Sequence, residues 1–163
     1  MPSSNLEGMQ AFAVAKDNGY SIQSLSTNTN ALLETPFILF KNSNALQKLM
    51  RVIRFHGSGN GLSNVQSTIM RIYLNPTITA NGAVIAVTPF RSASIASAVS
   101  VFQSPTITAN GTLIWSSVIN FQTVPILANM ASLFLEPNQN WLVTFQANQA
   151  NQPASFHMAW IEA

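Results

Sequence analysis

The 163-residue chain contains the segment PTITANG twice, at Pro76–Gly82 and again at Pro105–Gly111. Asn-Gly between apolar and β-branched residues is the strongest short-range signal for a β-hairpin with a type I′ turn, which requires positive φ at both central residues. We therefore predict two equivalent hairpins related by internal duplication; the alternative is a good turn sequence used twice. In each predicted hairpin an isoleucine faces an isoleucine: Ile78 faces Ile85, and Ile107 faces Ile114.

The rest of the chain also reads as short strands separated by turn residues. Alternating apolar residues and β-branched runs predict strands over 32–41, 46–56, 66–74, 141–147 and 155–162. The glycine-rich segment Gly57–Asn64 is predicted to be a loop, and the last two strands are predicted to pair as a C-terminal hairpin. This pattern is typical of an all-β antiparallel sandwich, which we assign to residues 31–163, after an irregular N-terminal arm over residues 1–30. The predicted core of its C-terminal part consists of Trp141, Phe145, Phe156 and Trp160.

The chain has very few charged residues. They make up 7% of the sequence, against about 25% in typical soluble domains, whereas Asn and Gln together number 27. Most soluble monomers carry more surface charge than this, so we expect much of the surface to be covered by partners in a permanent assembly. The alternative is an extracellular protein that tolerates a neutral surface. A net charge of +2 does not predict nucleic-acid binding, and no apolar run is long enough to predict a membrane-spanning helix.

No pattern of catalytic or metal-binding residues stands out. Cysteine is absent, His56 and His157 are the only histidines, and the five carboxylates are scattered. A glycosidase would require two facing carboxylates, for which Glu34 and Glu136 are the one conceivable pair. We predict that the protein is not an enzyme, and we assign it no catalytic, cofactor-binding or metal-binding residue and no cofactor.

Five residues are candidates for an interaction surface. Arginine is enriched at protein interfaces because its planar guanidinium group forms hydrogen bonds in two directions. Four of the seven basic residues are arginines in or beside predicted strands, although each could equally be a solvated charge. Trp115, at the end of the second predicted hairpin, is the tryptophan that the pattern leaves outside the core. The candidate interface residues are Arg51, Arg54, Arg71, Arg91 and Trp115.

The order of several segments resembles that of small virion proteins of tailed bacteriophages. The segments are TPFILFKNSN, RIYLNPTITANG, SPTITANGTLI and the closing LEPNQNWLVTFQANQANQPASFHMAWIE. The last of these is a strand, a polar loop and a strand that ends in aromatic-x-Glu, here Trp160-Ile161-Glu162. The resemblance covers residues 32–162 and implies a β-sandwich, of which the jelly roll is one form.

The resemblance implies a structural protein on the surface of the virion. The first expectation is a decoration or cement protein that contacts the major capsid protein, other virion proteins and its own copies. Because three-fold positions abound on icosahedral shells, we expect a homotrimer, with the small residues of Ser92–Val101 at a close inter-chain contact. The alternative is a receptor- or glycan-binding module of a phage fibre or tail, in which Trp115, Trp141 or Trp160 would stack on sugars.

Overall fold

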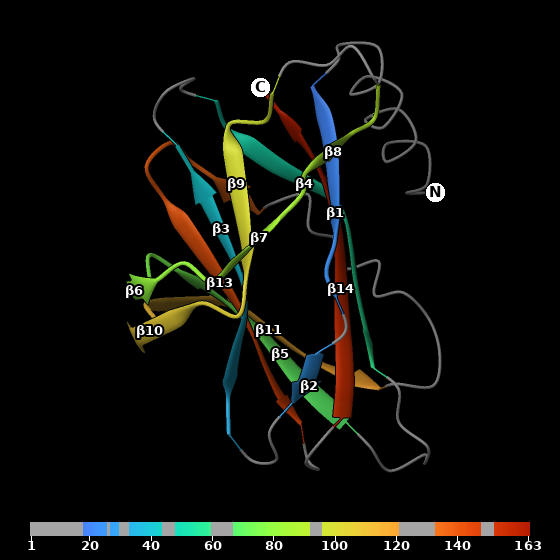
Figure 1. Ribbon diagram of the computed structural model, residues 1–163, viewed down its shortest axis with the longest axis vertical. Coiled ribbons are helices and arrows are strands. Elements are labelled where there is room, and N and C mark those ends of the chain that lie inside the picture. Colours follow the sequence, from blue (N-terminus) through green and yellow to red (C-terminus); the bar gives the residue numbers. More distant parts are fainter. Residues whose placement is uncertain are drawn as a thin grey trace.

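Two antiparallel sheets lie face to face in the computed structural model, and a two-stranded ribbon stands off one of them (Figure 1). The structure describes residues 18–25, 27–29, 33–43, 48–59, 67–91, 96–120, 133–147 and 152–163. Sheet A has the strand order β12 (Phe134–Leu135), β4 (Met50–Gly59), β14 (Gln152–Glu162), β1 (Gly19–Gln23) and β8 (Thr88–Pro89), with β2 (Thr27–Thr29) also paired to β14. Sheet B has the order β11 (Thr112–Asn120), β5 (Ser67–Leu74), β13 (Asn140–Ala147), β3 (Thr35–Asn42), β9 (Val99–Gln103) and β7 (Ala83–Ile85). The ribbon pairs β6 (Thr77–Ala80) with β10 (Thr106–Ala109).

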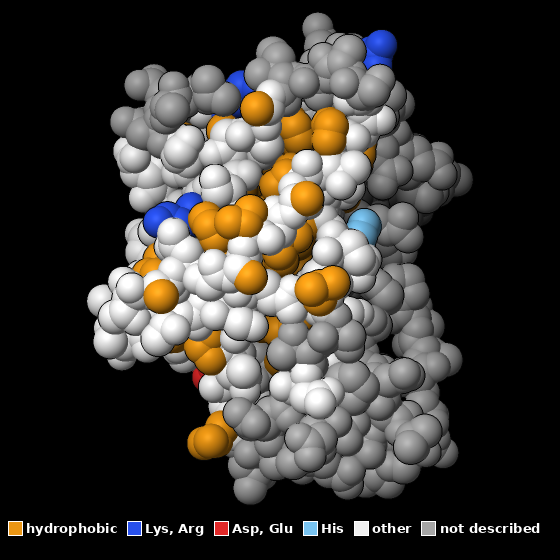
Figure 2. All heavy atoms as spheres, viewed as in Figure 1, with side chains coloured by type: hydrophobic (Ala, Val, Ile, Leu, Met, Phe, Trp, Pro, Cys, Tyr) orange, Lys and Arg blue, Asp and Glu red, His pale blue; other side chains and the backbone are white. Residues whose placement is uncertain are grey.

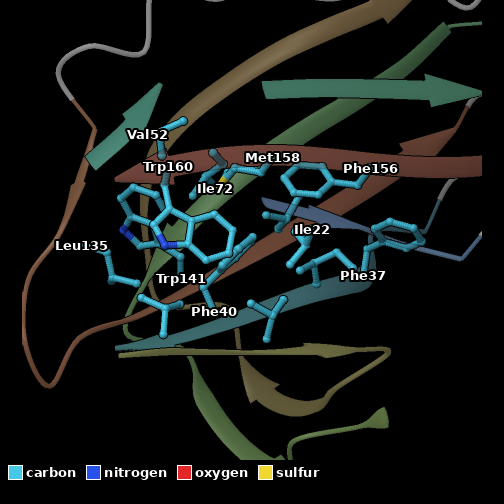
Figure 3. Packing of buried hydrophobic residues seen from close by; sticks show 14 of the residues in the cluster. Ile22, Phe37, Phe40, Val52, Ile72, Leu135, Trp141, Phe156, Met158 and Trp160 are labelled. Atoms are coloured by element: carbon cyan, nitrogen blue, oxygen red, sulfur yellow. The ribbon is translucent and has the colours of Figure 1, made fainter. Parts of the chain in front are cut away.

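One hydrophobic core fills the space between the two sheets. Alternate residues of β1, β4 and β14 meet alternate residues of β3, β5, β9 and β13, because successive side chains of a strand point to opposite faces. Phe40 of sheet B packs against Phe156 and Trp160 of sheet A, with ring centroids 6.0 Å apart in both pairs (Figure 3). The predicted core residues Trp141, Phe145, Phe156 and Trp160 are all buried in this cluster. The predicted sandwich and its core are therefore confirmed.

The sandwich begins earlier in the chain than we predicted. We assigned residues 1–30 to an irregular arm, but β1 and β2 are strands of sheet A. Tyr20 and Ile22 of β1 are 1% and 2% exposed and belong to the core. Residues 1–17 lie outside the described residues. The predicted loop at Gly57–Asn64 also begins too early, because β4 continues to Gly59.

The predicted C-terminal hairpin is wrong. β13 pairs with β3 and β5 in sheet B, whereas β14 pairs with β1, β2 and β4 in sheet A. The chain therefore crosses from one sheet to the other between these two strands. Each strand has hydrogen-bonded neighbours along both edges, which satisfy its backbone N–H and C=O groups and which a two-stranded hairpin would not provide.

The two PTITANG segments do not form local hairpins either. β6 pairs with β10, so that the two copies pair with each other and Ile78 faces Ile107 instead of Ile85. After each Asn-Gly the chain joins sheet B instead of returning along its own strand: β7 pairs with β9, and β11 pairs with β5. The turns are not type I′, because φ is positive at Gly82 and Gly111 but not at the preceding asparagines.

The duplication is nevertheless a structural repeat. We call the spacing from Pro76 to Pro105 the repeat offset. The chain leaves sheet B at Asn75 and Ser104, with φ of 52° and 54°, and the turn glycines Gly82 and Gly111 have φ of 89° and 90°. Each of these pairs is related by the repeat offset.

Sheet B has the symmetry of this repeat. The repeat offset relates β5 to β9 and β7 to β11, and these strands stand at mirrored places in the strand order, with β13 and β3 between them. An approximate two-fold axis therefore passes between β13 and β3 and through the ribbon. Repeat-related positions occupy equivalent places on either side of it.

Both turn glycines are required by their surroundings. A Cβ on Gly82 would lie 2.1 Å from the backbone oxygen of Gln103, and one on Gly111 would lie 2.2 Å from that of Leu74. An L-residue at these φ values is also strained.

We expect Gly82→Ala and Gly111→Ala each to lower the free energy of unfolding by about 2–4 kcal/mol, measured by urea denaturation. Ala80→Ser, on an exposed residue of the ribbon, is the control, with an expected change of less than about 0.5 kcal/mol. Glycine variants as stable as the control would contradict this account of the turns.

Candidate interaction surface

A row of apolar side chains crosses the outer face of sheet B from one edge to the other. The strand register places one apolar or aromatic residue of each strand directly beside the next. The row is symmetric about the approximate two-fold axis, because the repeat offset relates position 73 to 102 and position 84 to 113. Its members, from β11 to β7, are Leu113, Tyr73, Leu142, Leu39, Phe102 and Val84. We call it the apolar row.

The middle of the apolar row is covered, whereas its ends are open. Leu39 and Leu142 are 0% exposed although they point away from the core between the sheets. The ribbon leaves sheet B where β5 and β9 end, and these are the strands that flank β13 and β3 (Figure 1). By contrast, Val84 is 78% exposed and Leu113 is 51% exposed. The molecule thus presents two equivalent apolar side chains to solvent, one on each edge strand of sheet B.

An ion pair lies on the outer face beside the Tyr73 end of the row. The Arg71 guanidinium lies 3.5 Å from the Glu34 carboxylate and donates a hydrogen bond of 2.9 Å to Gln146. The hydroxyl of Thr144 donates to the same carboxylate. Burial raises the pKa of the Tyr73 phenol, and the hydrogen bond to Glu34 raises it further. Both effects favour the protonated phenol.

The candidate arginines do not form one site. Arg51 is on β4 of sheet A, where its guanidinium lies 5.6 Å from the centre of the Phe134 ring. Arg71 is on β5 of sheet B, and the exposed Arg91 follows β8. Arg54 is on β4 opposite Ala159, but its side chain lies outside what the structure describes. As a shared interface these residues stay a prediction.

Two of the three tryptophans cannot stack on a ligand. Trp141 and Trp160 are 0% exposed, and Trp115 is half-buried and packs against the core. The alternative prediction of a glycan site built on an exposed tryptophan therefore rests on Trp115 alone.

Glu162 is a buried carboxylate that joins the two sheets. It is 1% exposed and ends β14, and one of its oxygens accepts hydrogen bonds from the Ser97 hydroxyl (2.5 Å) and the Trp160 indole (3.1 Å). The other oxygen accepts one from the backbone N–H of Ala98, just before β9 (2.8 Å). In the sequence, aromatic-x-Glu stood out only as a pattern. The structure gives its physical reason: residues two apart on a strand share a face, so that Trp160 donates directly to Glu162.

A shallow groove of about 430 Å³ lies where β7 and β8, the edge strands of the two sheets, come together. Its lining is mostly apolar, and Figure 2 shows hydrophobic side chains gathered over this region. The expected inter-chain segment Ser92–Val101 reaches this groove only in part. Val99 and Val101 belong to the core, whereas Ser100 is exposed, and residues 92–95 lie outside the described residues.

The described residues contain no group of three His, Asp or Glu side chains that could hold a metal ion. No helix within the described part of the chain is long and apolar enough to cross a membrane.

No protein-family model matches the chain, and no curated protein is similar to it in sequence. Among solved structures it is similar to a chain from a particle of Israeli acute paralysis virus, described as heated to 63 degree, full particle. The TM-score is 0.30 at 9% identity, over 97% of this chain and 80% of that chain. Because this similarity is too low to establish a common fold, the surface itself is the basis for a proposed function.

Proposed function

We propose that the protein is a structural component of a virus particle, and that it decorates or cements the capsid of a tailed bacteriophage. Its partners are the major capsid protein or other virion proteins and further copies of itself. The sequence resemblance supports the class of particle. A rigid sandwich with a continuous core supports a structural role, because such a fold can hold a surface in fixed geometry.

The observation that carries the proposal is the pair of exposed apolar side chains at the edges of sheet B. Val84 and Leu113 are exposed at equivalent positions on either side of the ribbon. The ribbon itself, Thr77–Ala80 with Thr106–Ala109, contains no charged residue and is mostly exposed. A neutral surface with apolar side chains is favourable when a partner covers it and unfavourable in solvent.

The edge strand β11 supports contact between copies. Its nine residues, TLIWSSVIN, include neither a charged residue nor a proline, the usual devices that prevent edge-to-edge pairing. Val118 of this strand is 57% exposed. A symmetric oligomer would cover such an edge, and we propose a trimer because of the three-fold positions of icosahedral shells.

Capsid binding by edge variants tests this proposal. We expect the double variant Val84→Asp/Leu113→Asp to bind purified tailed-phage capsids assembled without the protein at least about tenfold more weakly than the unchanged chain, measured by co-sedimentation. Both side chains are exposed, so that the variant should keep its fold, which circular dichroism checks. Gln23→Asp adds a carboxylate to an exposed position of sheet A and should bind like the unchanged chain. Equal binding by all three proteins, or no binding by the unchanged chain, would contradict the proposal.

A further inference from the structure

A pocket of about 380 Å³, lined mostly by polar residues, opens on the outer face of sheet B where β3 ends and β9 begins. Ligand sites typically have volumes of about 300–1,000 Å³, and they combine an apolar or aromatic wall with a few polar groups. This pocket has one cation, one aromatic ring, two serines and three asparagines. It is lined by Lys41, Asn42, Ser43, Ser100, Phe102, Asn138 and Asn140, and we call it the Lys41 pocket.

The approximate two-fold axis relates the Lys41 pocket to the Arg71–Glu34 ion pair. Ser100 lies one repeat offset after Arg71. The two-fold axis also maps β3 onto β13, and this places Lys41 at the position of Thr144. The register agrees, because Lys41 pairs with Ser100 and Thr144 pairs with Arg71. On each side of the axis, a cation and a hydroxyl therefore lie on neighbouring strands. The cation Lys41 is on the inner strand β3 beside Ser100 of β9, whereas the cation Arg71 is on the outer strand β5 beside Thr144 of β13.

The two sides differ in what the cation and the hydroxyl bind. At the related site, Arg71 and Thr144 both contact the carboxylate of Glu34. At the Lys41 pocket, the Lys41 ammonium donates to the amide oxygen of Asn81 at 3.3 Å, and among the described residues no carboxylate lies within ion-pair distance of it. The same two-fold axis relates Glu34 to Pro137, and the neighbouring Glu136 accepts a hydrogen bond from Gln139 at 3.3 Å instead of pairing with Lys41. Among the described residues, the chain thus supplies the carboxylate on one side of the axis only.

Backbone hydrogen bonds hold the rest of the Lys41 pocket in place. Asn138 has φ of 65°, and its N–H donates to the carbonyl of Asn42 at 3.0 Å. The N–H of Asn140 donates to the side chain of Asn75 at 3.0 Å, which ties this wall to the start of the ribbon. Phe102, from the apolar row, adds an aromatic ring. Amides and hydroxyls pair with sugar hydroxyl groups, since both kinds of group donate and accept hydrogen bonds.

We propose that the Lys41 pocket binds a hexuronic acid residue of a polysaccharide. Its carboxylate takes the place that Glu34 has at the related site, between Lys41 and Ser100. Its ring packs beside Phe102, and its hydroxyls bond to Asn138 and Asn140. This site goes beyond capsid decoration and uses none of the three tryptophans.

Titration of the full-length, ¹⁵N-labelled protein with galacturonic acid tests this site. We expect amide signals of residues lining the pocket to shift, and galactose to bind at least about tenfold more weakly because it lacks the carboxylate. Acetate alone should also bind more weakly, since it contacts neither Phe102 nor the asparagines. Lys41→Met should weaken galacturonic acid binding at least about tenfold.

A second variant separates the pocket from the charge of Lys41. Ser100→Glu places a carboxylate of the chain itself beside the Lys41 ammonium, as Glu34 lies beside Arg71 at the related site, and it should abolish binding while Lys41 remains. Ser116→Glu is the matched control, because Ser116 is an exposed serine at the far edge of sheet B, opposite Arg71. It should bind like the unchanged chain. Binding that persists in Ser100→Glu, equal binding of galactose and galacturonic acid, or no shift with galacturonic acid would overturn the proposal.

Discussion

Replacing Phe145 by alanine is expected to lower the free energy of unfolding by about 3–5 kcal/mol, the usual cost of truncating a buried aromatic residue. Phe145 is 2% exposed, and its ring packs against Phe37 edge to face, with centroids 4.8 Å apart. The neighbouring strands β3 and β5 fix its backbone on both sides, so that the surroundings cannot collapse into the space that alanine would leave. Urea denaturation followed by circular dichroism measures the change.

Leu113→Ala is the matched control for Phe145→Ala. Leu113 also lies on a strand of sheet B, but half of its side chain is in solvent, so that its truncation should cost less than about 1 kcal/mol. A loss below about 1 kcal/mol for Phe145→Ala would show that this face of β13 is not part of the core.

Replacing Glu162 by alanine is expected to lower the free energy of unfolding by about 3–5 kcal/mol, because the change leaves buried hydrogen-bond donors without an acceptor. Without the carboxylate, the Ser97 hydroxyl, the Ala98 N–H and the Trp160 indole N–H lose their common acceptor in a site that water does not reach. Each unsatisfied buried donor costs about 1–3 kcal/mol. Thermal and urea denaturation both measure the loss.

Two further variants show that this loss comes from the hydrogen bonds of Glu162. Glu162→Gln keeps one oxygen as an acceptor but places an NH₂ group against a donor, so that its loss should be smaller than that of the alanine variant. Glu136→Ala removes an exposed carboxylate and should change stability by less than about 0.5 kcal/mol. If Glu162→Ala is as stable as Glu136→Ala, Glu162 does not join the sheets.

The strands and the core could be predicted from sequence because both depend on local alternation. β5 and β13 begin and end within one residue of the predicted positions. The pairing of the strands could not be predicted in this way. Asn-Gly predicts a turn but not which strand the chain pairs with next. Here the following strand is stabilised more by pairing in a six-stranded sheet than it would be by pairing with a strand of four residues.

The surface was predictable only in part. The low charge indicated a covered surface, but the apolar row depends on a register across six strands that no local pattern reports. Tyr73 and Phe102 are separated by the repeat offset, and this shared spacing is the one signal that could have related the two sides of sheet B. The role of Glu162 depends on Ser97 and Ala98, which belong to a distant part of the chain and come close to it only in the folded protein.

A cryo-EM map of an intact tailed-phage particle that carries this protein tests the capsid-decoration proposal most directly. We predict density for the sandwich on the capsid, in groups of three, with Val84 and Leu113 of sheet B buried against the shell or a neighbouring copy. Single copies at the tip of a fibre or tail, with both of these side chains open to solvent, would contradict the proposal.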